Sequence, residues 1–302
     1  MAKRVHFTVF AAAGVLMFAL CAGCSAETES GEMIGLNEDS SASCYAMEGL
    51  PNCYAISAAV DTTWLACARE AEGGTLQIEV LDARSQQSLF TLNGAAPYVT
   101  TDGLYYVVGQ DIWFRALDGD STTCLETSLT APIVRASPDS RYLYVQGIQG
   151  DSLRSFVFDT RAGREIPLPP SIPQDATWAE GDTLVLDAVE PSSRTGLFAI
   201  RDVTSFERPE LLADDVMWPS ANGRLIACWA RGAAPARLLT VDARTGVTRA
   251  LLELPVGVKP TGPVQWLDSQ SVVFVVCVGD SLVQREYEVF GACIGVKGTP
   301  AE

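Results

Sequence analysis

A unit of about forty residues recurs along most of the chain, and this spacing restricts the possible folds more than any other feature. Each unit contains an alternating strand that ends near an aspartate, a polar turn and a further strand. These aspartates are Asp82, Asp118, Asp159, Asp202 and Asp242, which lie 36, 41, 43 and 40 residues apart. We interpret them as residues of hairpin turns rather than calcium ligands, because no single turn concentrates several carboxylates.

A second type of hairpin precedes each of these units and then occurs once more. It combines a short strand that ends at an apolar residue, a tight turn and an apolar strand. Its copies begin at Ala58, Val99, Ala136, Trp178, Trp218 and Trp266. Two hairpins in about forty residues make one four-stranded propeller blade. We therefore predict an all-β chain, a β-propeller of about six four-stranded antiparallel blades, with seven blades as the alternative.

A propeller must join its last blade to its first, because an open ring would expose two strand edges. Residues 44–59, or the last strand near residues 287–296, are expected to provide this closure.

One turn carries a family resemblance. Ala136-Ser137-Pro138-Asp139-Ser140 resembles the Trp-Ser-Pro-Asp-Gly-like turn of WD40-like repeats in TolB-type periplasmic propellers. Trp178, Trp218 and Trp266 hold the tryptophan position in three other blades. The resemblance covers roughly residues 55–296 and implies a fold, not an activity. These tryptophans could form an aromatic ligand cage, but equivalent positions in successive blades favour packing between blades.

The pattern of the first residues of the chain is typical of an export signal. Lys3 and Arg4 precede an uncharged run over residues 5–23, which Cys24 and a polar segment follow. Residues 20–24 resemble the bacterial lipobox, with Cys21 where leucine is usual. We predict a lipoprotein with a lipid (palmitate) on Cys24, at the extracytoplasmic face of the cell membrane. An uncleaved membrane anchor and ordinary cleavage are the alternatives.

The predicted organisation therefore has three parts. Residues 1–23 are the lipoprotein signal peptide, residues 24–43 a flexible tether rich in Ser, Glu and Gly, and residues 44–302 the β-propeller domain.

Charge and histidine content exclude several functions. The formal net charge is -16, and removal of residues 1–23 takes away two basic residues and no acidic one, which gives -18. Such a chain repels phosphate backbones, so we expect no nucleic-acid partner. The single histidine, His6, lies in the predicted signal peptide. Histidine-based catalysis and histidine-ligated metals are therefore excluded from the mature chain, and we expect no cofactor and no metal site.

Seven cysteines follow Cys24. Cys44 and Cys53 flank a turn-rich loop and are predicted to form a local disulfide in an oxidising compartment. Cys67 and Cys228 occupy the same place in the second strands of their blades, and Cys277 lies two residues further along its own strand, on the same face. We expect buried thiols at all three.

Two functions remain open. The first is a membrane-tethered binding or scaffold protein, with an unknown protein, glycan or small-molecule ligand. The alternative is a carboxylate-based enzyme, such as a lyase, lactonase or glycoside hydrolase, that uses Asp139, Glu180 and Asp268. These three residues fall in equivalent turns and should gather at one end of the ring. We favour binding, because propeller enzymes generally use histidine or a bound metal.

Overall fold

The structure is a computed structural model. It describes residues 43–46, 53–60, 62–71, 74–117, 119–168, 172–189, 193–205, 208–278 and 286–293. For residues 43–46 and 286–293 it describes the backbone alone. The predicted signal peptide and most of the predicted tether lie outside the described residues, as does Cys24.

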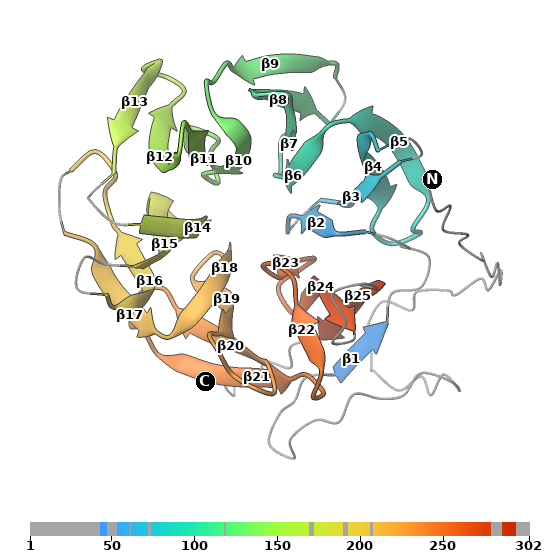
Figure 1. Cartoon of the computed structure of the whole chain (residues 1–302), viewed down its shortest axis with the longest axis vertical. Helices are drawn as coiled ribbons and strands as arrows, with labels where there is room; N and C mark the ends of the chain where they lie inside the picture. Colours follow the sequence, from blue (N-terminus) through green and yellow to red (C-terminus); the bar gives the residue numbers. More distant parts are fainter. Residues whose placement is uncertain are drawn as a thin grey trace, which may run out of the picture.

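Six antiparallel sheets stand around a central axis as the blades of a β-propeller (Figure 1). The predicted fold class, with six blades rather than seven, is confirmed. From the inner to the outer strand, blade 1 consists of β2 (Ala55–Ala58), β3 (Trp64–Glu70), β4 (Leu76–Asp82) and β5 (Ser88–Asn93). Blade 2 consists of β6 (Ala95–Val99), β7 (Gly103–Val108), β8 (Asp111–Ala116) and β9 (Ser121–Leu125). Blade 3 consists of β10 (Thr130–Ala136), β11 (Tyr142–Gln149), β12 (Ser152–Asp159) and β13 (Arg164–Pro167).

Blades 4 and 5 repeat this order. They are β14 (Ile172–Ala179), β15 (Thr183–Val189), β16 (Thr195–Ile200) and β17 (Glu210–Asp214); and β18 (Val216–Asn222), β19 (Leu225–Ala230), β20 (Arg237–Asp242) and β21 (Thr248–Glu253). A short 3-10 helix, η1 (Glu180–Asp182), joins β14 to β15.

Blade 6 closes the ring with strands from both ends of the propeller domain. Its inner strand is split into β22 (Val258–Pro260) and β23 (Gln265–Trp266), which both pair with β24 (Ser271–Val278). β25 (Glu286–Cys293) follows, and β1 (Ser43–Ala46) adds the outer strand. The prediction that these two segments close the ring is confirmed, because β1 covers the edge of β25.

The two ends of the ring carry different connections. Ser43 pairs with Cys293, which also pairs with Ser271, the first residue after the turn between the inner two strands of blade 6. We call this end proximal. It carries the turns between the first and second strands of each blade, and those between the third and fourth strands of blades 1 to 5. The opposite, distal end carries the turns between the second and third strands and the connections between blades.

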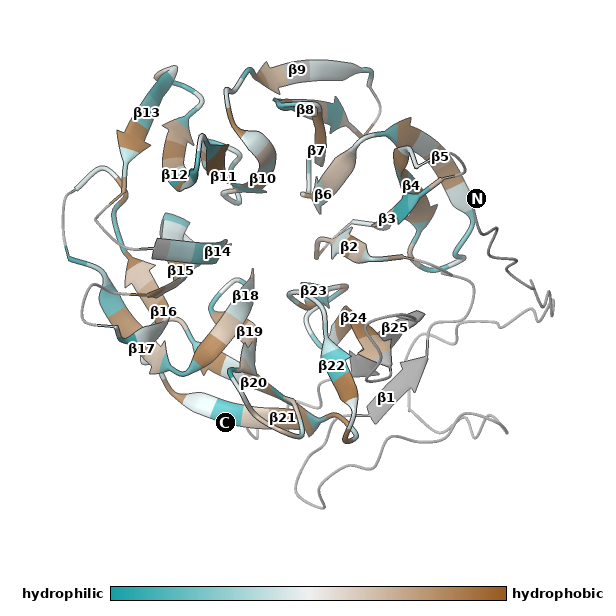
Figure 2. Cartoon of the chain, in the orientation of Figure 1, coloured by the Kyte–Doolittle hydropathy of each residue, from teal (hydrophilic) through white to brown (hydrophobic). Residues whose placement is uncertain are grey.

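The hydrophobic core lies between the blades. Six clusters of buried apolar side chains each combine residues of two consecutive blades, including blades 6 and 1. Successive residues of a second strand point to opposite neighbours, because side chains alternate across a sheet. Leu65 contributes to the cluster shared with blade 6, and Ala66 to the cluster shared with blade 2. Apolar residues recur along the strands of every blade in Figure 2.

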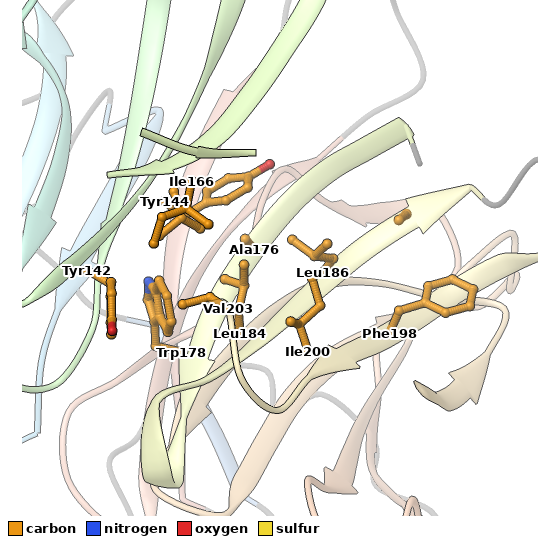
Figure 3. Packing of buried hydrophobic residues seen from close by; sticks show 12 residues of the cluster. Tyr142, Tyr144, Ile166, Ala176, Trp178, Leu184, Leu186, Phe198, Ile200 and Val203 are labelled. Carbon is orange, nitrogen blue, oxygen red and sulfur yellow. The ribbon is translucent and has the colours of Figure 1, made fainter. Parts of the chain in front are cut away.

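Two tryptophans connect neighbouring blades through their indole nitrogens. Nε1 of Trp178 donates a hydrogen bond of 2.8 Å to the carbonyl oxygen of Arg135, and Nε1 of Trp266 donates one of 2.9 Å to that of Ser220. Trp178 also stacks on Tyr142, with ring centroids 5.9 Å apart (Figure 3). The interpretation of these two tryptophans as packing residues is confirmed.

The predicted equivalence of Trp218 with Trp178 and Trp266 is wrong. Trp178 and Trp266 each lie opposite the second residue of the next strand, and in blade 5 this place belongs to Ala221. Trp218 lies three residues earlier, within an irregularity of β18. The local sequence imitates the turn motif, but strand pairing decides the register.

The repeating aspartates hold the turns between third and fourth strands. Oδ1 of Asp82 accepts hydrogen bonds from the backbone nitrogens of Arg84 and Ser85, at 3.1 and 2.7 Å. Oδ1 of Asp242 accepts equivalent bonds from Arg244 and Thr245. The interpretation of these aspartates as turn residues is confirmed at both positions.

Deletion of residues 283–302 removes β25, and with it the partner of both β24 and β1. We expect the shortened propeller domain to lose its cooperative unfolding transition, or to melt at least roughly 10 °C lower. Deletion of residues 294–302 alone leaves β25 intact and should preserve the wild-type transition. Thermal unfolding followed by circular dichroism measures both variants. An unchanged transition after the longer deletion would contradict this closure.

Candidate functional site

The three predicted face residues lie in turns at the proximal end of the ring. Asp139 follows β10, Glu180 opens η1, and Asp268 follows β23, so each occupies the turn between the inner two strands of its blade. The part of the chain that the structure describes holds no group of three metal-ligating side chains suited to an ion. These positions are therefore judged by their hydrogen bonds.

The carboxylate of Asp139 holds its own turn. It accepts hydrogen bonds of 2.9 Å from Oγ of Ser137 and from the backbone nitrogen of Arg141, and Nη2 of Arg161 lies 3.3 Å away. Partial burial works to raise the pKa of Asp139, but these hydrogen bonds and the arginine charges outweigh it and leave the pKa below its ordinary value. Asp139 is thus ionised at neutral pH and poorly suited to donate a proton.

Glu180 and Asp268 take part in contacts between neighbouring turns. The backbone nitrogen of Glu180 donates to the carbonyl oxygen of Gly223 at 2.9 Å. The carbonyl oxygen of Asp268 accepts from Nδ2 of Asn222 at 3.3 Å, and its Oδ1 accepts from the backbone nitrogen of Gln270 at 2.6 Å. The inner turns of blades 4, 5 and 6 are joined in series by these bonds. The carboxylate of Asp268 holds its own turn, whereas Glu180 contributes its backbone and has an exposed side chain.

A second group of charges, absent from the sequence interpretation, lies nearer the distal end. Asp175 of β14 and Asp187 of β15 are direct partners across the sheet of blade 4. Arg135 of blade 3 binds Asp175 at 3.1 Å, and Arg231 of blade 5 binds Oδ1 of Asp187 at 2.6 Å. We call these four residues the cross-blade charge cluster. Both carboxylates are buried, and Asp187 is completely so.

The backbone of Trp218 provides a further hydrogen-bond donor to Asp187. Its nitrogen donates a hydrogen bond of 3.1 Å to Oδ2 of Asp187. The φ angle of Trp218 is 55°, a left-handed conformation that is strained for a large side chain. Ala96 and Ala131 have similar φ angles in the inner strands of blades 2 and 3. Each of the three residues precedes a proline, a repeated signal that could have located these irregularities.

Burial raises the pKa of Asp187 to about 6, while the charge of Arg231 and the hydrogen bond from Trp218 act to lower it. The group can therefore change charge near neutral pH. Its carboxylate has no exposed surface, and Arg231, which also contacts the exposed Gln174 at 3.3 Å, lies between it and solvent. The arrangement connects blades 3, 4 and 5 and does not present a carboxylate to a substrate.

Large apolar side chains are exposed at the distal end. Leu76, Val108, Ile148 and Leu153 are each at least 40% exposed, and they lie on the hairpins between second and third strands of blades 1, 2 and 3. Ile148 and Leu153 are direct cross-strand partners. We call these four residues the distal apolar patch. Patterns of strand residues alone did not reveal it, because exposure depends on where each strand ends.

The cysteine predictions have separate outcomes. Cys67 and Cys228 are buried thiols, as expected, whereas Cys277 is only partly buried because it lies near the end of β24. Cys53 is also a buried free thiol, whereas the side chain of Cys44 lies outside the described residues. The Cys44–Cys53 disulfide therefore stays a prediction. No helix among the described residues is long and apolar enough to cross a membrane.

Comparison with solved structures shows a common fold. TolB from Acinetobacter baumannii superposes with a TM-score of 0.55 at 12% identity, over 72% of this chain and 59% of that chain. A putative TolB from Agrobacterium tumefaciens gives 0.55 at 12% identity, over 86% of this chain and 98% of that chain. Oligogalacturonate lyase in complex with manganese gives 0.52 at 11% identity, over 88% and 98%.

No protein-family model and no curated protein matches the sequence. The chain covers less than two thirds of the first TolB structure. At 11 to 12% identity the likeness concerns fold alone, so the resemblance to TolB-type propellers is confirmed for the architecture.

Asp187 should give the folded state a distinct pH dependence. Because its pKa is about 6 in the folded chain and ordinarily 3.8, the folded state holds a proton between these values that the unfolded state has released. The free energy of unfolding should therefore fall as pH rises from 4 to 6, by about 2 kcal/mol for this group, and then level off. Asp187→Asn should lack this slope in chemical denaturation.

Asp202→Asn is the matched control. Hydrogen bonds from Thr204 lower the pKa of Asp202, so its contribution changes only below pH 4 and the slope between pH 4 and 6 should remain. An identical slope in the wild type and in Asp187→Asn would show that Asp187 does not titrate there.

Proposed function

We propose that this protein is a lipid-anchored, extracytoplasmic binding or scaffold protein whose distal end receives a protein partner. The observation that carries the proposal is the distal apolar patch on three consecutive blades. Large apolar side chains that gather at one exposed end of a fold mark interaction sites. Leu89, Leu117 and Val247 are also exposed, at the proximal end, but only at the distal end do two of the exposed residues, Ile148 and Leu153, pair directly. Polar groups border this patch: Arg154, beside Leu153, binds Gln149 and Glu165. An apolar centre with a polar rim is the usual composition of a protein interface.

The form of the patch favours a protein over a small ligand. Its residues lie at the tips of hairpins, and side chains on projecting turns offer a broad contact surface without enclosing a molecule. Val256, in the connection from blade 5 to blade 6, is 89% exposed at the same end of the ring and could extend the contact.

The attachment of the chain supports the same orientation. β1 begins at Ser43 at the proximal end, so the predicted tether joins the ring there. A lipid on Cys24 would hold the proximal end towards the membrane, with the distal end on the opposite side of the ring. A partner approaching from outside the membrane would then meet the distal end first.

The carboxylate-based enzyme is the weaker proposal. The carboxylates of Asp139 and Asp268 accept hydrogen bonds within their own turns, and the buried carboxylate of Asp187 is paired with Arg231. Asp182, which is partly exposed in the inner turn of blade 4, has its pKa raised by partial burial and by the neighbouring charge of Asp139. The arginines Arg141 and Arg161 act against this rise, and this turn is the position at which a carboxylate enzyme would have to work.

A photo-crosslinking amino acid at position 148, in the membrane-bound protein, tests the partner site. We expect one discrete crosslinked species, which an excess of soluble wild-type propeller displaces. A competitor carrying Ile148→Ser and Leu153→Ser should be at least about tenfold weaker, because it loses two apolar contacts.

Position 247 provides the control, since Val247 is also exposed but lies at the proximal end. Leu117→Ser with Val247→Ser is the control competitor and should match the wild type. Equal crosslinking from positions 148 and 247, or equal competition by both double variants, would refute the proposal.

The address is tested separately. Intact-mass measurement of detergent-extracted protein should show loss of residues 1–23 and addition of a diacylglycerol at Cys24. Cys24→Ala should block processing and lipid addition, whereas Cys21→Ala should preserve both. A mature protein that retains Met1 would contradict the lipoprotein assignment.

A further inference from the structure

Two cysteine thiols lie in contact in blade 1. Cys53 lies two residues before the start of β2, and Cys67 lies in the middle of β3. Both cysteines belong to the same buried cluster, where Cys67 lies beside Cys53, and the thiol of Cys53 donates to the carbonyl oxygen of Ala55 at 3.2 Å. Cys53 is 2% exposed and Cys67 is 3% exposed, so both side chains are buried in the cluster between blades 1 and 6.

Strand pairing explains the contact. β2 pairs Ala55 with Ala68, yet the backbone nitrogen of Tyr54 also donates to the carbonyl oxygen of Ala68 at 3.1 Å. Two residues of the inner strand therefore face one residue of β3, which is a bulge. The bulge places residue 53 diagonally across from residue 67 on the same face of the sheet, and both side chains pack in the cluster between blades 1 and 6.

Blade 5 contains the same arrangement with one sulfur. Leu65 and Ile226 are the second residues of β3 and β19, so Cys228 corresponds to Cys67. Val216 and Cys53 each lie five residues before the corresponding inner-strand alanine, and Val216 packs in the same cluster as Cys228. A valine is thus sufficient for packing against the cysteine of the second strand. Packing alone does not require the second sulfur in blade 1.

We propose that Cys53 and Cys67 form a disulfide that links β2 to β3 in the exported protein, in place of the Cys44–Cys53 pairing expected from the sequence. The compartment rests on the proposed extracytoplasmic function, but the pairing itself rests on the structure. The two thiols lose two protons and two electrons to the disulfide of an exported thiol–disulfide oxidoreductase, which is released as a dithiol after a mixed disulfide. Since both sulfurs are buried in the folded ring, this exchange takes place before blades 1 and 6 pack together.

The disulfide would act where the ring closes, at the junction of blade 6 with blade 1. It closes a loop of about 15 residues at the point where the chain passes from β1 in blade 6 to β2 in blade 1, and restricts the unfolded chain accordingly. At this junction, blade 6 is built from strands that lie far apart in the sequence. A local crosslink there limits opening of the first blade.

Peptide mapping without reduction tests the pairing in protein purified from the membrane fraction. No lysine or arginine lies between Arg4 and Arg69, so trypsin would leave all three candidate cysteines on one peptide. Cleavage at Glu48 and before Asp61 instead separates Cys44, Cys53 and Cys67. We expect the fragments that carry Cys53 and Cys67 to be linked.

Variants measure how much the disulfide stabilises the propeller. Cys53→Val copies the valine and cysteine pair of blade 5, and should abolish the link and lower the Tm by roughly 5–10 °C relative to the oxidised wild type. The Tm of the variant should not respond to reductant. Cys228→Ala is the matched control, in which the link and its response to reductant should remain.

A second arm separates this proposal from the proposed address. Purified, reduced and unfolded protein is refolded with oxidised glutathione, and it should form the same link wherever the protein resides in the cell. A Cys44–Cys53 link, or free thiols at positions 53 and 67 after refolding, would overturn the pairing. Free thiols in protein recovered from the cytosol, with the link formed on refolding, would overturn only the extracytoplasmic address.

Discussion

Packing between blades is the interaction on which the rest of this structure depends. Each sheet is apolar on both faces, and no blade can bury both faces by itself. The six buried clusters each need two neighbours, so the chain gains its full hydrophobic stabilisation only when the ring is complete. Closure of blade 6 by β1 is therefore a condition for burial of the whole core.

Polar groups take their roles from this packing. Where blades approach one another, hydrogen bonds connect the indole of Trp178 to blade 3 and that of Trp266 to blade 5. Arg135 and Arg231 reach Asp175 and Asp187 across the same interfaces, nearer the distal end. The charges that look most like a catalytic group are thus internal to the ring, whereas the exposed distal hairpins carry apolar side chains.

The direction of the chain links this architecture to its proposed use. β1 enters at the proximal end and seals the outer edge of blade 6, so the segment that precedes it joins the ring where the inner turns lie. The distal apolar patch is at the opposite end. Under the proposed function, the anchor and the partner site occupy opposite ends of the ring.

The repeat period, the alternation of apolar residues and the turn aspartates were enough to predict an all-β ring of six blades, because these are local properties of each hairpin. Register was not local: Trp218 carried a familiar motif, but pairing assigned its expected place to Ala221. Nor did the sequence reveal that Asp175 faces Asp187, or that Cys53 contacts Cys67, since a bulge of one residue changes which side chains meet. The sequence by itself determined the architecture, and it is the basis of the proposed address. Only the tertiary structure decided which groups are buried, paired or exposed, because those depend on neighbouring blades.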